Sequence, residues 1–136
     1  MLINNVGSPT FDLCTFTGNS AETYGGAIDA INGSSPAIQN CVFESNTALN
    51  FKGGAIAAGE ASPVHVLDCT FTSNQSALNG GAIYTSSVGV AVTIDGSTFT
   101  LNTSDTAGGA IAANNGGHAD ISTSAFCQNS LPQVDG

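Results

Sequence analysis

The sequence has almost no positive charge. Its 136 residues contain one lysine, no arginine and ten acidic residues, for a formal net charge of −9 at pH 7. A protein that binds nucleic acid needs cations to displace the counterions of the phosphates, so this composition argues strongly against nucleic acid as a partner. The same shortage of cations argues against electrostatic binding to an anionic membrane surface.

Long apolar runs and tryptophan are also missing. No stretch of about 18 apolar residues is present, so we expect no direct membrane insertion by this segment. With 17 glycines and no tryptophan, a core must be built mainly from small side chains. Residues 1–5 lack the basic start and apolar run of a signal peptide, so we expect any targeting segment to lie outside this chain. The four cysteines have long spacings and no nearby histidine, which argues against a metal site.

Two short motifs alternate strictly along the chain. Phe-x-x-Asn occurs five times, with steps of 27, 28, 28 and 27 residues, and Gly-Gly-Ala-Ile occurs four times, with steps of 28, 27 and 28. Self-similarity at such a period indicates a solenoid. The repeated positions are Phe16, Phe43, Phe71, Phe99 and Phe126; Asn19, Asn46, Asn74, Asn102 and Asn129; and Ile28, Ile56, Ile83 and Ile111.

Each unit reads as three short strands separated by Gly, Asn, Ser and Pro: Cys-Thr-Phe-Thr, Gly-Gly-Ala-Ile, and Val-His-Val or its equivalent. This predicts an all-β fold, a right-handed parallel β-helix of nearly five rungs about 4.8 Å apart, with three sheets. A leucine-rich repeat fits less well, and a helical solenoid would place glycine pairs inside its helices. We expect residues 1–136 to form a single β-helix domain, a fragment of a longer passenger-like region.

The alternation along a strand assigns the faces. In Cys-Thr-Phe-Thr, the Cys and Phe side chains share the core face and the two threonines point outward. We therefore expect inward ladders of Phe, Ile and Cys or Ser, with free thiols, and a ladder of Asn at a bend, where each amide bonds to its own rung and the next. The outward face presents Thr-x-Thr pairs, a possible binding face, at Thr15, Thr17, Thr70, Thr72, Thr98 and Thr100.

The strict alternation of Phe-x-x-Asn with Gly-Gly-Ala-Ile closely resembles the repeats of the polymorphic outer membrane proteins first recognised in chlamydiae. The resemblance covers essentially the whole chain. That family consists of autotransporters, in which a β-helical passenger carries the repeats and a C-terminal barrel sits in the outer membrane. The resemblance implies extracellular or cell-surface display, anchored to the outer membrane in the full-length protein, and a role in adhesion.

Candidate catalytic groups look isolated. Lys52 stands alone in a turn and is expected to be solvated. Asp12 and Asp95 fall in one column about 14 Å apart by the rung spacing, Asp29 faces outward, and no pair of carboxylates converges. His65 and His118 are expected at the surface, on different corners, without an acidic partner. We therefore expect no catalytic residue, metal or cofactor.

Three functions remain open. The first is a non-catalytic structural stalk or adhesive passenger segment, whose partners are neighbouring rungs of the same protein or copies stacked end to end, with an unidentified host-surface or glycan ligand. The second is the scaffold of a β-helical polysaccharide-active enzyme whose site lies outside this chain. The third is an ice- or glycan-binding face built on the outward Thr-x-Thr pairs.

Overall fold

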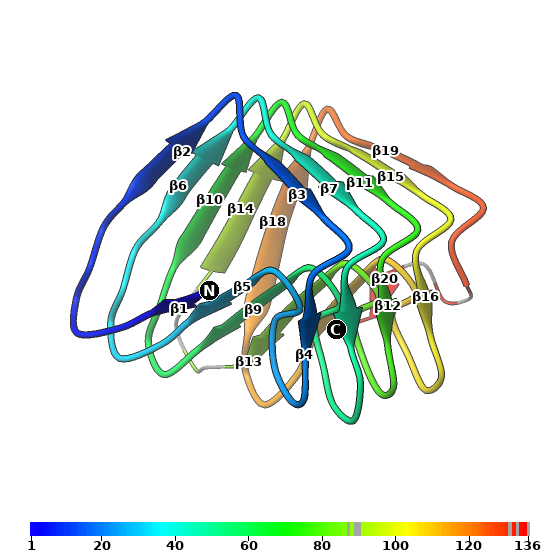
Figure 1. Ribbon diagram of the computed structural model, residues 1–136, viewed down its shortest axis with the longest axis horizontal. Coiled ribbons are helices and arrows are strands. Elements are labelled where there is room, and N and C mark those ends of the chain that lie inside the picture. The colour runs from blue at the N-terminus through cyan, green and yellow to red at the C-terminus, as the bar shows by residue number, and fades with distance from the viewer. Residues whose placement is uncertain (87, 89–90, 131, 133, 136) are drawn as a thin grey trace.

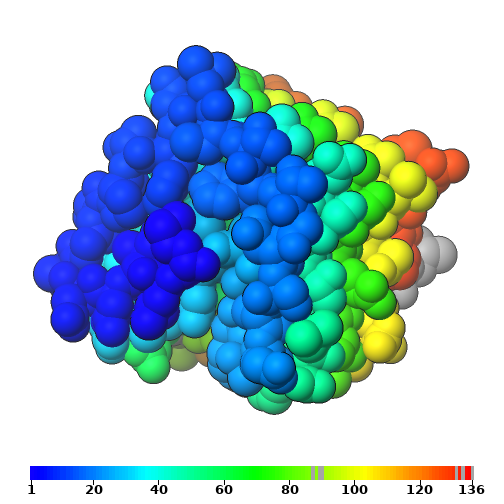
Figure 2. Space-filling model, in the orientation of Figure 1, coloured from blue at the N-terminus to red at the C-terminus, as the bar shows by residue number. Residues whose placement is uncertain are grey.

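The computed structural model describes residues 1–86, 88, 91–130, 132 and 134–135. Throughout these residues the regular structure is β-strand, and the chain coils so that every strand pairs in parallel with its counterpart one repeat away (Figure 1). In the space-filling view, the coils follow one another in chain order from the N-terminal to the C-terminal end (Figure 2). The parallel solenoid predicted from the repeat is therefore confirmed.

The strands form four sheets. Sheet A comprises β1 (Leu2–Ile3), β5 (Ile28–Ala30), β9 (Ile56–Gly59), β13 (Ile83–Ser86), β17 (Ile111–Ala113) and β20 (Val134–Asp135). Sheet B comprises β2 (Thr10–Asp12), β6 (Ala37–Gln39), β10 (Val64–Leu67), β14 (Ala91–Asp95) and β18 (His118–Ser122). Sheet C comprises β3 (Thr15–Thr17), β7 (Val42–Glu44), β11 (Thr70–Thr72), β15 (Thr98–Thr100) and β19 (Ala125–Cys127). Sheet D comprises β4 (Ser20–Ala21), β8 (Thr47–Ala48), β12 (Gln75–Ser76) and β16 (Thr103–Ser104).

Sheets A, B and C correspond to the three predicted strands of each repeat, and sheet D is an addition. Its strands have two residues each and begin directly after the repeated asparagine. A side-chain hydrogen bond from each asparagine fixes the backbone there, so that the next two residues of neighbouring rungs come into register. Two residues are too few for the alternation of side chains to reveal a strand in the sequence.

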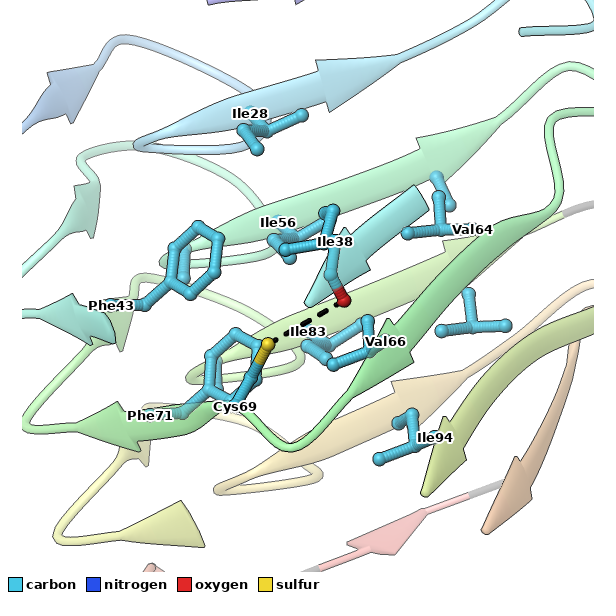
Figure 3. Packing of buried hydrophobic residues seen from close by; sticks show 14 of the residues in the cluster. Ile28, Ile38, Phe43, Ile56, Val64, Val66, Cys69, Phe71, Ile83 and Ile94 are labelled. Atoms are coloured by element: carbon cyan, nitrogen blue, oxygen red, sulfur yellow. Dashed lines mark hydrogen bonds between the residues drawn. The ribbon is translucent and has the colours of Figure 1, made fainter. Parts of the chain in front are cut away.

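The Phe and Ile ladders are confirmed. The rings of Phe43, Phe71 and Phe99 are fully buried, and neighbouring rings are stacked with centroids 4.7 Å apart and interplanar angles of 2–4°. Phe16 and Phe126 continue the stack at the two ends. The four repeated isoleucines are also fully buried, and in Figure 3 Ile56 and Ile83 lie beside Phe43 and Phe71 inside the coil.

The asparagine ladder is also confirmed. The Asn46 backbone N–H and side-chain Nδ2 both donate to Oδ1 of Asn74, at 3.0 and 2.9 Å, and Asn46 Nδ2 also donates to the Phe16 carbonyl oxygen at 2.9 Å. Asn74 repeats this pattern with Asn102 and Phe43. The buried amides thereby satisfy backbone groups that the bend would otherwise leave unpaired.

The inward column of Cys and Ser forms a second side-chain ladder. The Cys14 N–H donates to Sγ of Cys41 at 3.4 Å, and the Cys69 N–H donates to Oγ of Ser97 at 3.1 Å. Figure 3 shows Cys69 Sγ directed at the Ile38 carbonyl oxygen, 3.6 Å away. All three thiols are free, as predicted. The position thus requires a small side chain that both accepts and donates a hydrogen bond, which explains why serine replaces cysteine in the later rungs.

The Gly-Gly pair precedes the strand of sheet A, whereas the sequence placed it inside that strand. Gly53 has a φ of +72°, in the left-handed region, and a Cβ on Gly54 would lie 2.1 Å from the Gly81 carbonyl oxygen. The first glycine therefore makes the turn and the second allows two rungs to approach closely. Strand β9 begins only at Ile56.

Candidate functional site

The outer face of sheet A is hollowed between strands β5 and β13. Asp29, Ala57 and Tyr84 occupy the same outward column on three successive rungs. Because alanine stands between two larger residues, the surface dips over β9 into a pocket of about 270 Å³. Its walls include Tyr24, Asp29, Ala57, Glu60, Tyr84 and Ser86.

Aromatic side chains close one side of this pocket. Tyr24 and Phe51 come from the turns that precede Gly25 and Gly53, and their rings meet edge to face with centroids 4.8 Å apart. Tyr84 reaches them from β13, with its ring centroid 6.4 Å from that of Tyr24. Tyr84 is buried and Tyr24 remains partly exposed, so Tyr24 presents aromatic surface to solvent.

Lys52 is part of this cluster, and the prediction of a solvated, isolated lysine is wrong. Its side chain is half-buried. Nζ donates to the Tyr84 hydroxyl at 3.1 Å and lies 4.6 Å from the Tyr84 ring centroid and 5.4 Å from that of Phe51. The cause is Tyr84, which extends across rungs to meet the turn of Lys52. An ammonium over an aromatic face is attracted by the ring quadrupole.

Two carboxylates converge on the pocket, which corrects the expectation that no pair does. Asp29 lies on β5, and Glu60 follows β9 in a tight turn where Glu60 and Ala61 both have positive φ, at 50° and 58°. That turn places Glu60 on the wall of the pocket, where its charge acts on Asp29. Counting residues along strands could not foresee this, because the turn departs from strand alternation.

The pKa of the Asp29 carboxyl group is raised above its ordinary value. Burial raises its pKa, the N-terminal ammonium of Met1 lowers it, and the negative charge of Glu60 raises it further. The carboxylate accepts no hydrogen bond and forms no close ion pair within the described part of the chain. Burial also raises the pKa of Tyr24, with the neighbouring Tyr84 adding to the shift. The pocket therefore contains a partly desolvated anion beside aromatic rings.

The outward threonines lie where the alternation placed them. Thr70 pairs with Thr98 and Thr72 with Thr100, so four threonines form a continuous patch across two rungs. Thr15 and Thr17 are separated from that patch by Val42 and Glu44 on the intervening strand. The Thr-x-Thr array is therefore interrupted, and its intact part is small.

The histidines lie at the surface, as predicted, but both lie on sheet B and not on different corners, and one has an acidic partner. His118 begins strand β18, and its Nε2 is 2.7 Å from Oδ1 of Asp120. His65 Nδ1 is 2.8 Å from the Thr93 hydroxyl, on the same sheet. The i, i+2 spacing of His118 and Asp120 was the available signal, since both side chains then share one face of a strand.

Sheet B places Asp95 and Asp120 on one groove, together with His65. Asp12, Gln39, Leu67 and Asp95 share one outward column in that order, so Asp12 and Asp95 are three rungs apart as expected. A shallow groove of about 450 Å³ runs over β10, β14 and β18. Among the residues that the structure describes, no three His, Cys, Asp or Glu side chains are placed to hold a metal ion.

The coil, its four parallel sheets and its internal ladders define a β-helical solenoid. Residues 1–126 match the family described as the right-handed β-helix region, and the chain belongs to that family. The match agrees with the predicted hand of the coil. Neither the curated proteins nor the solved structures contain a significant match to this sequence. In the described residues, no helix is long and apolar enough to cross a membrane.

Proposed function

We propose that the chain is a non-catalytic repeat module of an extracellular or cell-surface protein, a stalk or adhesin passenger segment of the polymorphic outer membrane protein type. The observation that carries the proposal is the set of unbroken ladders. Phe, Ile and Asn stack rung on rung, so each rung buries its core mainly against its neighbours. Such a solenoid gains length by adding rungs without needing a new core, which suits a stalk.

Composition supports the surface role. One lysine against ten acidic residues leaves a net charge of −9, which keeps a protein soluble and disfavours association with like-charged surfaces. The alternating Phe-x-x-Asn and Gly-Gly-Ala-Ile motifs are the residues that support kinship with the autotransporter passengers.

The test is protease shaving of intact cells that express the full-length reading frame, followed with antibodies against this chain. We expect epitopes of residues 1–136 to be lost from intact cells, while a cytoplasmic marker protein survives. Protection until the cells are lysed would contradict surface display.

The scaffold of a polysaccharide-active enzyme is the second candidate, and the pocket that holds Asp29 and Glu60 favours it. Two carboxylates on one pocket, one with a raised pKa, are the minimum that glycoside hydrolysis requires. Under the first proposal, incubation with pectin, alginate or neutral glucans releases no product, with or without calcium. Release that disappears in Asp29→Asn and persists in Asp95→Asn would establish the enzyme instead.

A further inference from the structure

We propose that the pocket on the outer face of sheet A binds a small organic ligand that carries a protonated amine. This site goes beyond a structural role and does not depend on where the protein is displayed. The arrangement that carries it is one half-buried carboxylate, a second carboxylate and two tyrosines around a hollow floored by Ala57.

The shape of the pocket limits the size of the ligand. The floor is Ala57 and Gly59, and the outward positions on the flanking rungs carry Asp29 on one side and Tyr84 and Ser86 on the other. With flanking strands about 9.6 Å apart, two rung spacings, the opening is one side chain wide. A volume of about 270 Å³ suits a lysine-like chain or a single sugar ring, and is below the range typical of drug-sized ligands.

The charge of the pocket selects a cation. Its lining contains Asp29 and Glu60 and no basic side chain. Asp29 accepts no hydrogen bond within the described residues, and the Met1 ammonium, which lowers its pKa, donates to the Ala27 carbonyl oxygen instead. A ligand ammonium in the pocket would therefore give the carboxylate a direct charge-assisted partner. The net charge of −9 also draws cations toward the surface.

The aromatic side of the pocket already holds one ammonium. Lys52 Nζ lies 4.6 Å from the Tyr84 ring centroid and donates to its hydroxyl, so the cluster stabilises such a group. The positive charge of Lys52 is felt at Tyr24, whose pKa it lowers against the dominant effect of burial. A ligand amine is therefore expected at the carboxylate end of the pocket, with its carbon skeleton against the partly exposed ring of Tyr24.

The test is titration of the folded chain, followed by NMR shifts of the Ala57 and Gly59 amides and by calorimetry. The probes are n-butylammonium, which reproduces a lysine side chain, and glucosamine, an amino sugar; n-butanol and glucose are their neutral counterparts. We expect each amine to shift the floor amides with a Kd roughly tenfold or more below that of its neutral counterpart, as loss of one charge-assisted hydrogen bond implies. Whichever amine binds more tightly shows whether the ligand resembles a lysine side chain or an amino sugar.

Variants locate the site. Asp29→Asn and Glu60→Gln each remove one negative charge from the pocket and should weaken amine binding roughly tenfold. Glu44→Gln removes one charge from the exposed face of sheet C and should leave the affinity unchanged. Equal binding of glucose and glucosamine would replace the proposal with neutral sugar recognition. Equal loss in Glu44→Gln would reduce it to diffuse charge attraction, and unshifted floor amides would eliminate the site.

Discussion

At the scale of single residues, the two faces of one strand contribute very differently to the free energy of unfolding. The Phe71 ring is fully buried and stacked between Phe43 and Phe99, whereas Thr72 points outward. We expect Phe71→Ala to lower the free energy of unfolding by about 3–5 kcal/mol through lost contacts and a cavity. Thr72→Ala should change it by less than about 0.5 kcal/mol. Urea unfolding of both variants checks this, and equal midpoints would contradict the assigned faces.

Asp29 should make stability depend on pH. Burial raises its folded pKa, the Met1 ammonium opposes this, and Glu60 adds to it. The folded state therefore holds the Asp29 proton more tightly than the unfolded state. The resulting stability is fully present below the unfolded pKa, about 3.9, and is lost as pH rises through the higher folded pKa.

Asp29→Asn removes this penalty, so the variant should melt at a higher temperature than the parent at pH 7. The gain should shrink at pH 3, where Asp29 is protonated in both states. Thermal melts of both proteins at the two pH values measure the difference. Asp12→Asn, at an exposed position, serves as the control. A variant that is destabilised at pH 7 but not at pH 3 would show that the Asp29 carboxylate is favourably paired.

The thiols should react in an order set by exposure. Burial raises the pKa of Cys41, and it raises that of Cys69 to about 11, while Cys127 is exposed. Because the thiolate is the reactive form, Cys127 should be alkylated first under native conditions. Mass spectrometry after brief exposure to iodoacetamide gives the order. Labelling of Cys41 before Cys127 would mean that the inward ladder opens readily.

At the scale of elements, the second glycine of each pair sets how closely the rungs approach. A Cβ on Gly54 would lie 2.1 Å from the Gly81 carbonyl oxygen and 2.5 Å from that of Gln75, both backbone atoms that cannot move aside cheaply. We expect Gly54→Ala to cost about 3 kcal/mol or more. Gly59→Ala is the matched control, because its nearest neighbour would be Ser86 Oγ at 3.9 Å and its φ is ordinary. Similar unfolding midpoints would show that the rungs separate easily.

The sequence predicted those elements whose signal repeats. Phe71 and Asn74 recur at 27 or 28 residues, so stacking in register follows directly from the period. The strand Gln75–Ser76 escaped prediction because its pairing depends on the hydrogen bonds of the preceding asparagine. A pattern of hydrophobicity contains no information on such bonds in a two-residue strand.

The pocket was not predicted because it is built from residues that differ between rungs, whereas the prediction used the residues that repeat. Tyr24, Lys52 and Asn79 occupy equivalent places before the first glycine of each pair, yet only the first two join the aromatic cluster. Tyr84 meets Lys52 across 32 residues of sequence. A residue that differs from its counterparts in the other rungs forms contacts that the repeat does not predict. Such contacts can be found only in the three-dimensional structure.

At the scale of the whole molecule, the charge is strongly one-sided. The net charge is −9 with histidine neutral, and within the described residues the one close contact between a basic side chain and a carboxylate is the exposed pair of His118 and Asp120, an ion pair only when the imidazole is protonated. Salt therefore has many repulsions to screen and few attractions to weaken. The compact state, in which the acids are closest together, gains more from screening than the unfolded chain does.

We accordingly expect the melting temperature at pH 7 to rise as NaCl is increased from about 0.01 to 0.15 M, over which the Debye length falls from about 30 to 8 Å. The rise should level off beyond that range, because excluded-salt effects on apolar burial grow only at molar concentrations. A melt series at pH 4 is the control: near the sequence pI of about 4.1 the repulsion is largely gone, and so is the salt increment. A melting temperature that falls with salt at pH 7 would mean that attractive pairs outweigh the repulsion. Equal increments at both pH values would trace the effect to apolar burial instead of charge.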